Sequence, residues 1–126
     1  MVVTSPEILS LRVDASLYFP NARFIEDLVN DAVAANPAVR HLIVECAAVN
    51  TIDASALESL EAINRRLQDG GVTFHLSEVK GPIMDRLKRS HFLEELSGKA
   101  HLTQYDAVSS INPDLARRTL DPQRVP

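Results

Sequence analysis

The sequence predicts an α/β fold in which helices pack against a mixed β-sheet of about four to five strands. Segments rich in Ile, Leu and Val alternate with segments whose apolar residues recur at helical spacing. The first apolar segments resemble a hairpin, so the sheet should combine antiparallel and parallel pairs. With 126 residues, 45% of them hydrophobic, the chain is large enough to bury the core of one compact domain.

The first half of the chain is expected to form a strand pair, a helix and a central strand. Residues 8–19 are rich in Ile, Leu and Val, with Asp14 and Ala15 interrupting them in the middle, which indicates two short strands joined by a tight turn. A helix should begin with Asn21 as its N-cap and stop before Pro37, because apolar residues recur between them at i, i+3 and i+4. Residues 39–49 form a nearly continuous apolar run, which is typical of a strand covered on both faces.

The second half continues the alternation of helices and strands. A helix should begin within residues 49–60 and end at Gly70 and Gly71. Residues 72–79 alternate apolar and polar side chains, which predicts a strand with one better-buried face. The remaining elements are shorter: a helix with Pro82 in its first turn, a short segment over 92–98, a brief strand over 100–103 and a helix over 104–111.

Composition limits the classes of partner and location. The domain is expected over residues 8–111, with an N-terminal extension over 1–7 and a tail or linker over 112–126. A net charge of −4 gives no positive field that would attract nucleic acid. The single Cys46 excludes an internal disulfide, fits a reducing cytosol and is interpreted as a buried small hydrophobe. No apolar run approaches the ~18 residues of a membrane span and the start lacks a signal peptide, so the chain alone is expected to be soluble.

The loop before the second long helix is the main candidate site for a partner or ligand. Its residues are Asn50, Thr51, Asp53, Ala54 and Ser55. Three interpretations stay open: a helix cap by Ser55 with Glu58, or equivalently by Asp53; phosphorylation of Ser55; and a pocket for an anion at the helix N-terminus. The small side chains would let a partner's backbone approach closely, which favours a protein contact.

A second set of residues is a candidate docking surface. It combines a basic run with an aromatic segment, namely Lys80, Arg86, Lys88 and Arg89 with Tyr18, Phe19 and Asn21. The basic side chains should point outward while Ile83 and Leu87 face the core. They form either a solvated face or a docking surface for anionic headgroups or an acidic protein such as an acyl carrier protein.

Other chemistry is not supported by residue spacing. The four histidines are scattered and no metal-binding motif is present, so neither a metal nor a cofactor is expected. Gly70 and Gly71 lack the spacing of a phosphate-binding loop. A triad of Ser77, His75 and Glu78 is rejected because neighbouring side chains of one strand point to opposite faces.

Three motifs carry a resemblance to a known family over about residues 8–110. They are LYFPNA at residues 17–22, VNTIDASALESL at residues 49–60 and EVKGPIMDRLKRSHF at residues 78–92. These segments resemble STAS domains, which occur in anti-sigma factor antagonists and at the C-terminal, cytoplasmic end of SulP-type anion transporters. The resemblance implies a STAS-like sheet and a non-catalytic regulatory or interaction domain, and LYFPNA favours the transporter branch.

One position departs from the antagonist branch. There the aspartate of the loop is followed by a phosphorylated Ser or Thr, whereas Asp53 is followed by Ala54. The leading interpretation is therefore the regulatory domain of a sulfate or related anion transporter, at the inner face of the cell membrane, with the transporter's membrane domain as partner. A free-standing antagonist-like switch protein is the alternative. Some relatives imply weak nucleotide or anion binding, but no residue pattern here marks such a site.

Overall fold

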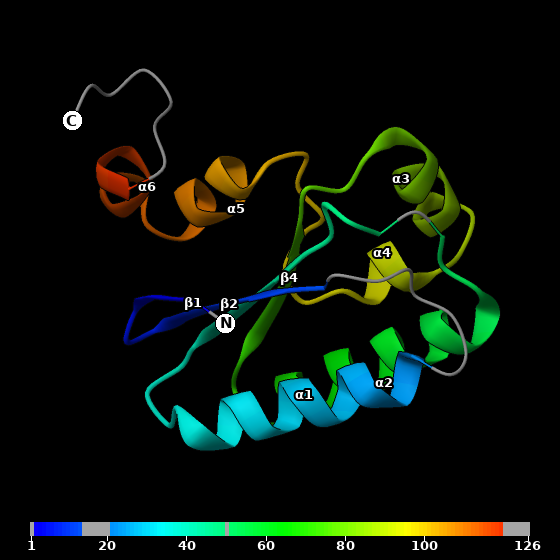
Figure 1. Ribbon diagram of the computed structural model, residues 1–126, viewed down its shortest axis with the longest axis horizontal. Helices are drawn as coiled ribbons and strands as arrows, with labels where there is room; N and C mark the ends of the chain where they lie inside the picture. The colour runs from blue at the N-terminus through cyan, green and yellow to red at the C-terminus, as the bar shows by residue number, and fades with distance from the viewer. Residues whose placement is uncertain (1, 14–20, 50, 120–126) are drawn as a thin grey trace.

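The computed structural model describes residues 2–13, 21–49 and 51–119, which form an α/β domain with a four-stranded mixed sheet (Figure 1). The strands lie in the order β1-β2-β3-β4; β1 is antiparallel to β2, and the other pairs are parallel. The strands are β1 Val2–Ser5, β2 Ile8–Arg12, β3 His41–Glu45 and β4 Thr73–Ser77. The helices are α1 Asn21–Ala35, α2 Ala54–Asp69, α3 Gly81–Lys88, α4 Phe92–Glu95, α5 Gln104–Ile111 and α6 Pro113–Thr119. The predicted fold class and the mixed sheet are confirmed.

The sheet separates two cores of unequal size. Leu9, Leu42 and Phe74 are paired in register and point into a large core beneath α1 and α2. Residues of the opposite face, such as Ile8 and Ile43, form a small core with α5 and α6. Figure 1 shows α1 and α2 on one side of the sheet and α5 and α6 on the other. The alternation of side chains along each strand therefore serves both layers.

The two long helices follow the apolar periodicity of the sequence. In α2, the predicted apolar positions Leu57, Leu60, Ile63 and Leu67 are all buried. The helix ends at Gly70, and Gly71 has a φ of 77°, a left-handed conformation that favours glycine. Burial of one stripe on each helix accounts for most of the large core.

The ends of the chain differ from the expectation. Residues 2–5, assigned to an extension, form β1 and pair with β2, so the hairpin turns at Pro6 and Glu7. The second strand and the turn expected within residues 14–19 lie outside the described residues. Part of the expected tail forms α6, which buries Leu115 and Ala116 in the small core. Neither element was foreseen: β1 pairs with the neighbouring β2, whereas α6 is stabilised by residues distant in sequence such as Ile8 and Ile43.

Strand β4 also differs, because both of its faces are buried. We expected one better-buried face, yet His75 is 6% exposed and Ser77 is 0% exposed. Helix α5 covers this second face, where Gln104 accepts a hydrogen bond from Ser77 at 2.5 Å and donates one to Ser10 at 2.9 Å. The brief strand expected over residues 100–103 is reduced to a bridge between Leu76 and Ala100.

Gly98 lies so close to β4 that a larger residue does not fit. Its amide donates to the carbonyl of Phe74 at 3.0 Å. A Cβ at this position would lie 2.5 Å from Nδ1 of His75 and closer still to the carbonyl oxygen of Phe74. Because the carbonyl belongs to a strand, the clash cannot be relieved by a side-chain rotation.

Gly98→Ala is therefore expected to lower the free energy of unfolding by about 1–3 kcal/mol, the scale of overpacking. Urea denaturation of the variant and the parent chain measures this difference. Gly81→Ala is the matched control, since a Cβ there meets nothing within 4 Å. A loss at Gly98 no larger than at Gly81 would contradict the close approach.

Candidate functional site

Residues 46–53 connect the end of β3 to the start of α2, and the candidate loop residues lie at the end of this connection and in the first turn of the helix. The connection begins with a backbone hydrogen bond from Cys46 to Ser77 of β4 at 2.9 Å, followed by a turn in which Val49 donates to Cys46 at 3.0 Å. Val49 and Ile52 are buried, whereas Thr51 is exposed. The loop thus lies at the edge where the parallel strands end, the usual position of binding sites in such sheets. Asn50 lies outside the described residues.

Asp53 caps the first turn of α2. Its backbone is extended, with φ −88° and ψ 177°, and its Oδ1 accepts a hydrogen bond from the amide of Ala56 at 2.8 Å. Ser55 lies inside the helix as its second residue and is exposed. Of the two capping arrangements that the sequence left open, the structure has the one with Asp53. An anion approaching this helix end would meet the negative charge of that carboxylate.

Two basic side chains, one just before α3 and one within it, donate hydrogen bonds to backbone carbonyls of the loop. Nζ of Lys80 donates to the carbonyl of Ala47 at 3.3 Å, and Nε of Arg86 donates to the carbonyl of Ile52 at 3.2 Å. The structure therefore brings part of the candidate docking surface into contact with the candidate loop. We expected Arg86 to point outward with the other charges, but it is half-buried because it reaches the loop backbone.

The other proposed docking residues are placed less closely. Lys88 and Arg89 are exposed at the end of α3, while Ile83 and Leu87 face the core as expected. Asn21 is the first residue of α1. Tyr18 and Phe19 lie outside the described residues.

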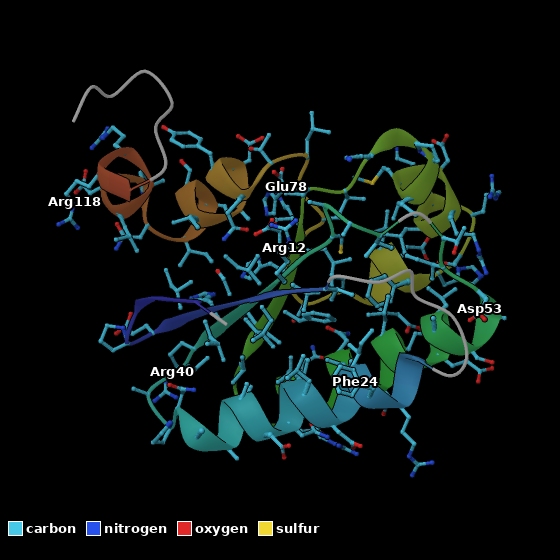
Figure 2. All side chains as sticks on the ribbon, viewed as in Figure 1. Arg12, Phe24, Arg40, Asp53, Glu78 and Arg118 are labelled. Atoms are coloured by element: carbon cyan, nitrogen blue, oxygen red, sulfur yellow. The ribbon has the colours of Figure 1, made fainter. Side chains whose placement is uncertain are left out.

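An exposed apolar pair on α1 was missed by the sequence analysis. Phe24 is 67% exposed and Leu28 is 36% exposed. Glu26 on the same helix accepts a hydrogen bond from Ser59 of α2 at 2.9 Å, so this end of α1 lies beside the beginning of α2 (Figure 2). The i, i+4 spacing of Phe24 and Leu28 places them next to each other on the helix, but it is also the spacing of the buried Ile25 and Val29, so it gave no signal of exposure.

The histidines are arranged differently from the sequence expectation. His41, His75 and His101, which appeared scattered, lie next to one another, with successive ring centroids 5.4 and 6.1 Å apart. Within the described ranges, however, no three His, Cys, Asp or Glu side chains form a metal-binding group.

Cys46 is buried, as predicted, and burial raises the pKa of its thiol to about 12. The thiol therefore stays protonated near neutral pH and is a poor nucleophile. Among the helices of the described chain, none is long and apolar enough to cross a membrane.

Comparison with known proteins identifies the family. The chain matches the STAS domain over residues 1–110. Sulfate transporter 1.3 of Arabidopsis thaliana is 29% identical over an alignment of 121 positions that covers 88% of this chain and 18% of that protein. A sulfate transporter family protein from Wolinella succinogenes has a similar structure, with a TM-score of 0.70 and 18% identity over 89% of this chain and 88% of that one. A putative anti-sigma factor antagonist from Thermotoga maritima gives a TM-score of 0.72 and 17% identity over 82% and 86%.

At these identities the two structures establish a shared fold. The chain spans less than a fifth of the length of the curated transporters that it matches first.

The capping geometry predicts how two neighbouring substitutions differ. Asp53→Ala should lower the free energy of unfolding by about 1 kcal/mol, because the amide of Ala56 loses its acceptor. Asp53→Asn should retain most of that stability, and Ser55→Ala should change it by less than about 0.5 kcal/mol. Urea denaturation of the three variants measures the differences, and an equal loss in Ser55→Ala would assign the cap to the serine.

Proposed function

The chain belongs to the STAS domain family, and we propose that it is the cytoplasmic regulatory domain of a SulP-type transporter of sulfate or a related anion. In this role the domain catalyses no reaction and uses no cofactor. It acts by binding another part of the transporter and so supports folding, oligomer packing or gating.

The braced loop is the observation that carries a binding role. Lys80 and Arg86 hold its backbone, and Asp53 fixes the start of α2. The side chains exposed beside these contacts, at Ala54 and Ser55, are small. A surface that is already ordered loses little conformational entropy when a partner binds, and short side chains let the partner's backbone approach. These properties suit a protein interface.

The relatives support the assignment to a transporter. Several curated matches, such as those from Arabidopsis thaliana, are named sulfate transporters, and most of their length lies outside the region matched by this chain. We therefore propose that the main partner is the transporter's membrane domain on the same polypeptide. The domain would lie at the inner face of the membrane, with the loop directed toward that partner.

Secondary partners follow from the charge of α3. Lys88 and Arg89 are exposed and suit an acidic protein such as an acyl carrier protein. Weak binding of an anion or nucleotide beside the α2 N-terminus is a further proposal, limited by the Asp53 carboxylate. The net charge of −4 disfavours nucleic acid as a partner.

For the domain boundaries, we now propose that the folded unit includes β1 and α6 as well as residues 8–111.

A free-standing switch protein is the alternative, favoured by the similar fold of the putative anti-sigma factor antagonist from Thermotoga maritima. Its weak point is Ala54, which has no hydroxyl to phosphorylate where the antagonists carry Ser or Thr. A phosphate on Ser55 would gain from the helix N-terminus but would lie near the carboxylates of Asp53 and Glu58.

The transporter proposal predicts the size and contacts of the native protein. An antibody against this domain should detect, in membrane fractions of the source cells, a polypeptide several times larger than 126 residues. In that native protein, a photoreactive benzophenone amino acid in place of Ser55 should crosslink within the same polypeptide to a membrane-spanning peptide, which mass spectrometry identifies.

The same amino acid in place of Ala38 is the matched control. Ala38 is also exposed but lies before the start of β3, at the opposite ends of the parallel strands from the loop. In the antibody experiment, a soluble band of the size of this chain would favour the switch protein. Equal crosslinking from positions 55 and 38 would show that the loop is not a specific part of the interface.

Phosphorylation separates the two functions independently. Incubation with ATP and an extract of the source cells should leave Ser55 unmodified, as measured by mass spectrometry of the loop peptide. Ala54→Ser restores a hydroxyl directly after Asp53 and tests whether the extract contains a kinase for this loop. Stoichiometric phosphate on Ser55 of the parent chain would contradict the transporter-type interpretation of the loop.

A further inference from the structure

Three histidines form a row on the face of the sheet that α5 covers. His41 begins β3, His75 lies at the centre of β4, and His101 follows Ala100, which bridges to the outer edge of β4. His75 is paired in register with Ile43, a residue of the small core. Nδ1 of His41 and Nε2 of His75 are 3.2 Å apart, so the two neutral rings share one hydrogen bond. The row thus joins three neighbouring backbone segments, β3, β4 and the segment that precedes α5.

The environment of His75 suits only a neutral ring. Among the described residues, Nδ1 of His75 and Nε2 of His101 are buried and have no hydrogen-bond partner. The backbone of Gly98 lies directly against Nδ1 of His75. A charged ring carries a hydrogen on both nitrogens, so its N–H at Nδ1 would have no acceptor. The positive charge would also be buried between two other histidines.

The surrounding charges do not compensate for this burial. Burial, followed by His41 and His101, lowers the pKa of His75 to about 4. Burial also lowers the pKa of His41, against the opposing charge of Glu7. The pKa of His101 is lowered by burial and by Lys99, and Asp106 of α5 opposes this effect. The carboxylates of Glu7 and Asp106 thus oppose the lowering of the pKa at the two ends of the row, His41 and His101, but not at His75.

The sign of the pH effect follows from these directions. The pKa of His75 is lower in the folded chain than its ordinary value of 6.5, so the unfolded or opened chain binds the proton more tightly. The stability that the neutral ring supports is fully present above about pH 6.5 and is lost progressively as the pH falls toward 4.

The layer above the row is the weaker of the two. Among the described residues, the small core contains six buried residues: Ile8, Ile43, Ala107, Val108, Leu115 and Ala116. Four of them are on α5 or α6, and three of these four are alanine or valine, which have short side chains. The large core includes most of the remaining buried apolar residues. Besides this patch, Gln104 ties α5 to the sheet through Ser10 and Ser77. Local opening is expected first where the least apolar area is buried.

We propose that the row of His41, His75 and His101 is an acid-sensitive latch, in which protonation releases α5 and α6 from the sheet while the core beneath α1 and α2 stays folded. Release exposes the apolar patch of the small core, centred on Ile8 and Ile43. The latch is independent of the transporter assignment, because it depends only on contacts within this chain.

Amide hydrogen exchange of the 126-residue chain at pH 7 and pH 5 tests the proposal. After correction for the intrinsic pH dependence, exchange in α5 and α6 should increase about tenfold at the lower pH, whereas α1 and α2 should change little. His75→Gln removes the titrating ring and should reduce the increase to less than about twofold. His91→Gln is the matched control, because His91 is exposed and outside the row, and it should behave as the parent chain.

Two results would overturn the latch. Equal loss of protection in all helices at pH 5 would show global unfolding, and an unchanged increase in His75→Gln would show that the histidine is not responsible. If His75→Gln fails to fold at pH 7, His101→Gln provides the same comparison. Imidazole NMR titration of the parent chain adds an independent measurement, since a His75 pKa near 6.5 in the folded state contradicts the proposal.

Discussion

The register of the three parallel strands is the constraint on which the rest of the structure depends. Leu9, Leu42 and Phe74 lie side by side, and so do Ser10, Ile43 and His75 on the other face. A slip of one residue would exchange the faces and direct polar side chains into the large core. The same register fixes the end of each strand, and therefore the edge from which the candidate loop starts.

The candidate site depends on where the parallel strands end and on the side chains of Asp53, Lys80 and Arg86. Asp53 sets the first turn of α2, and Lys80 and Arg86 connect the loop to α3 and the residue before it. Two positive charges are used here to satisfy backbone carbonyls, so their contribution is structural as well as electrostatic. These three contacts lie within the chain itself, and the side chains of Ala54 and Ser55 beside them are exposed.

The sequence predicted the elements that carry their own periodicity. The helical stripe of α2 and the apolar run of β3 were identified because local spacing and burial agree. It did not reveal the cover provided by α5 and α6, because the residues that they bury are widely separated along the chain. The histidine row was missed for the same reason, since neighbours in the row are 34 and 26 positions apart.

At the loop, the composition identified Asp53 and Ser55, but only backbone geometry assigned the cap to Asp53. The braces from Lys80 and Arg86 are long-range contacts that no local pattern encodes.

The unequal sizes of the two cores also have a mechanical consequence. Helix α6 is the last element described and is held by the small core, whereas the strands are joined to one another by rows of hydrogen bonds. Tension applied through the C-terminal end of the domain would act first on the contacts of α6 and then on those of α5. Both helices would detach before any pair of strands is separated. Such a domain yields in two stages under force, and its first stage lengthens the connection to whatever pulls on it while the sheet and the loop of Asp53 keep their shape.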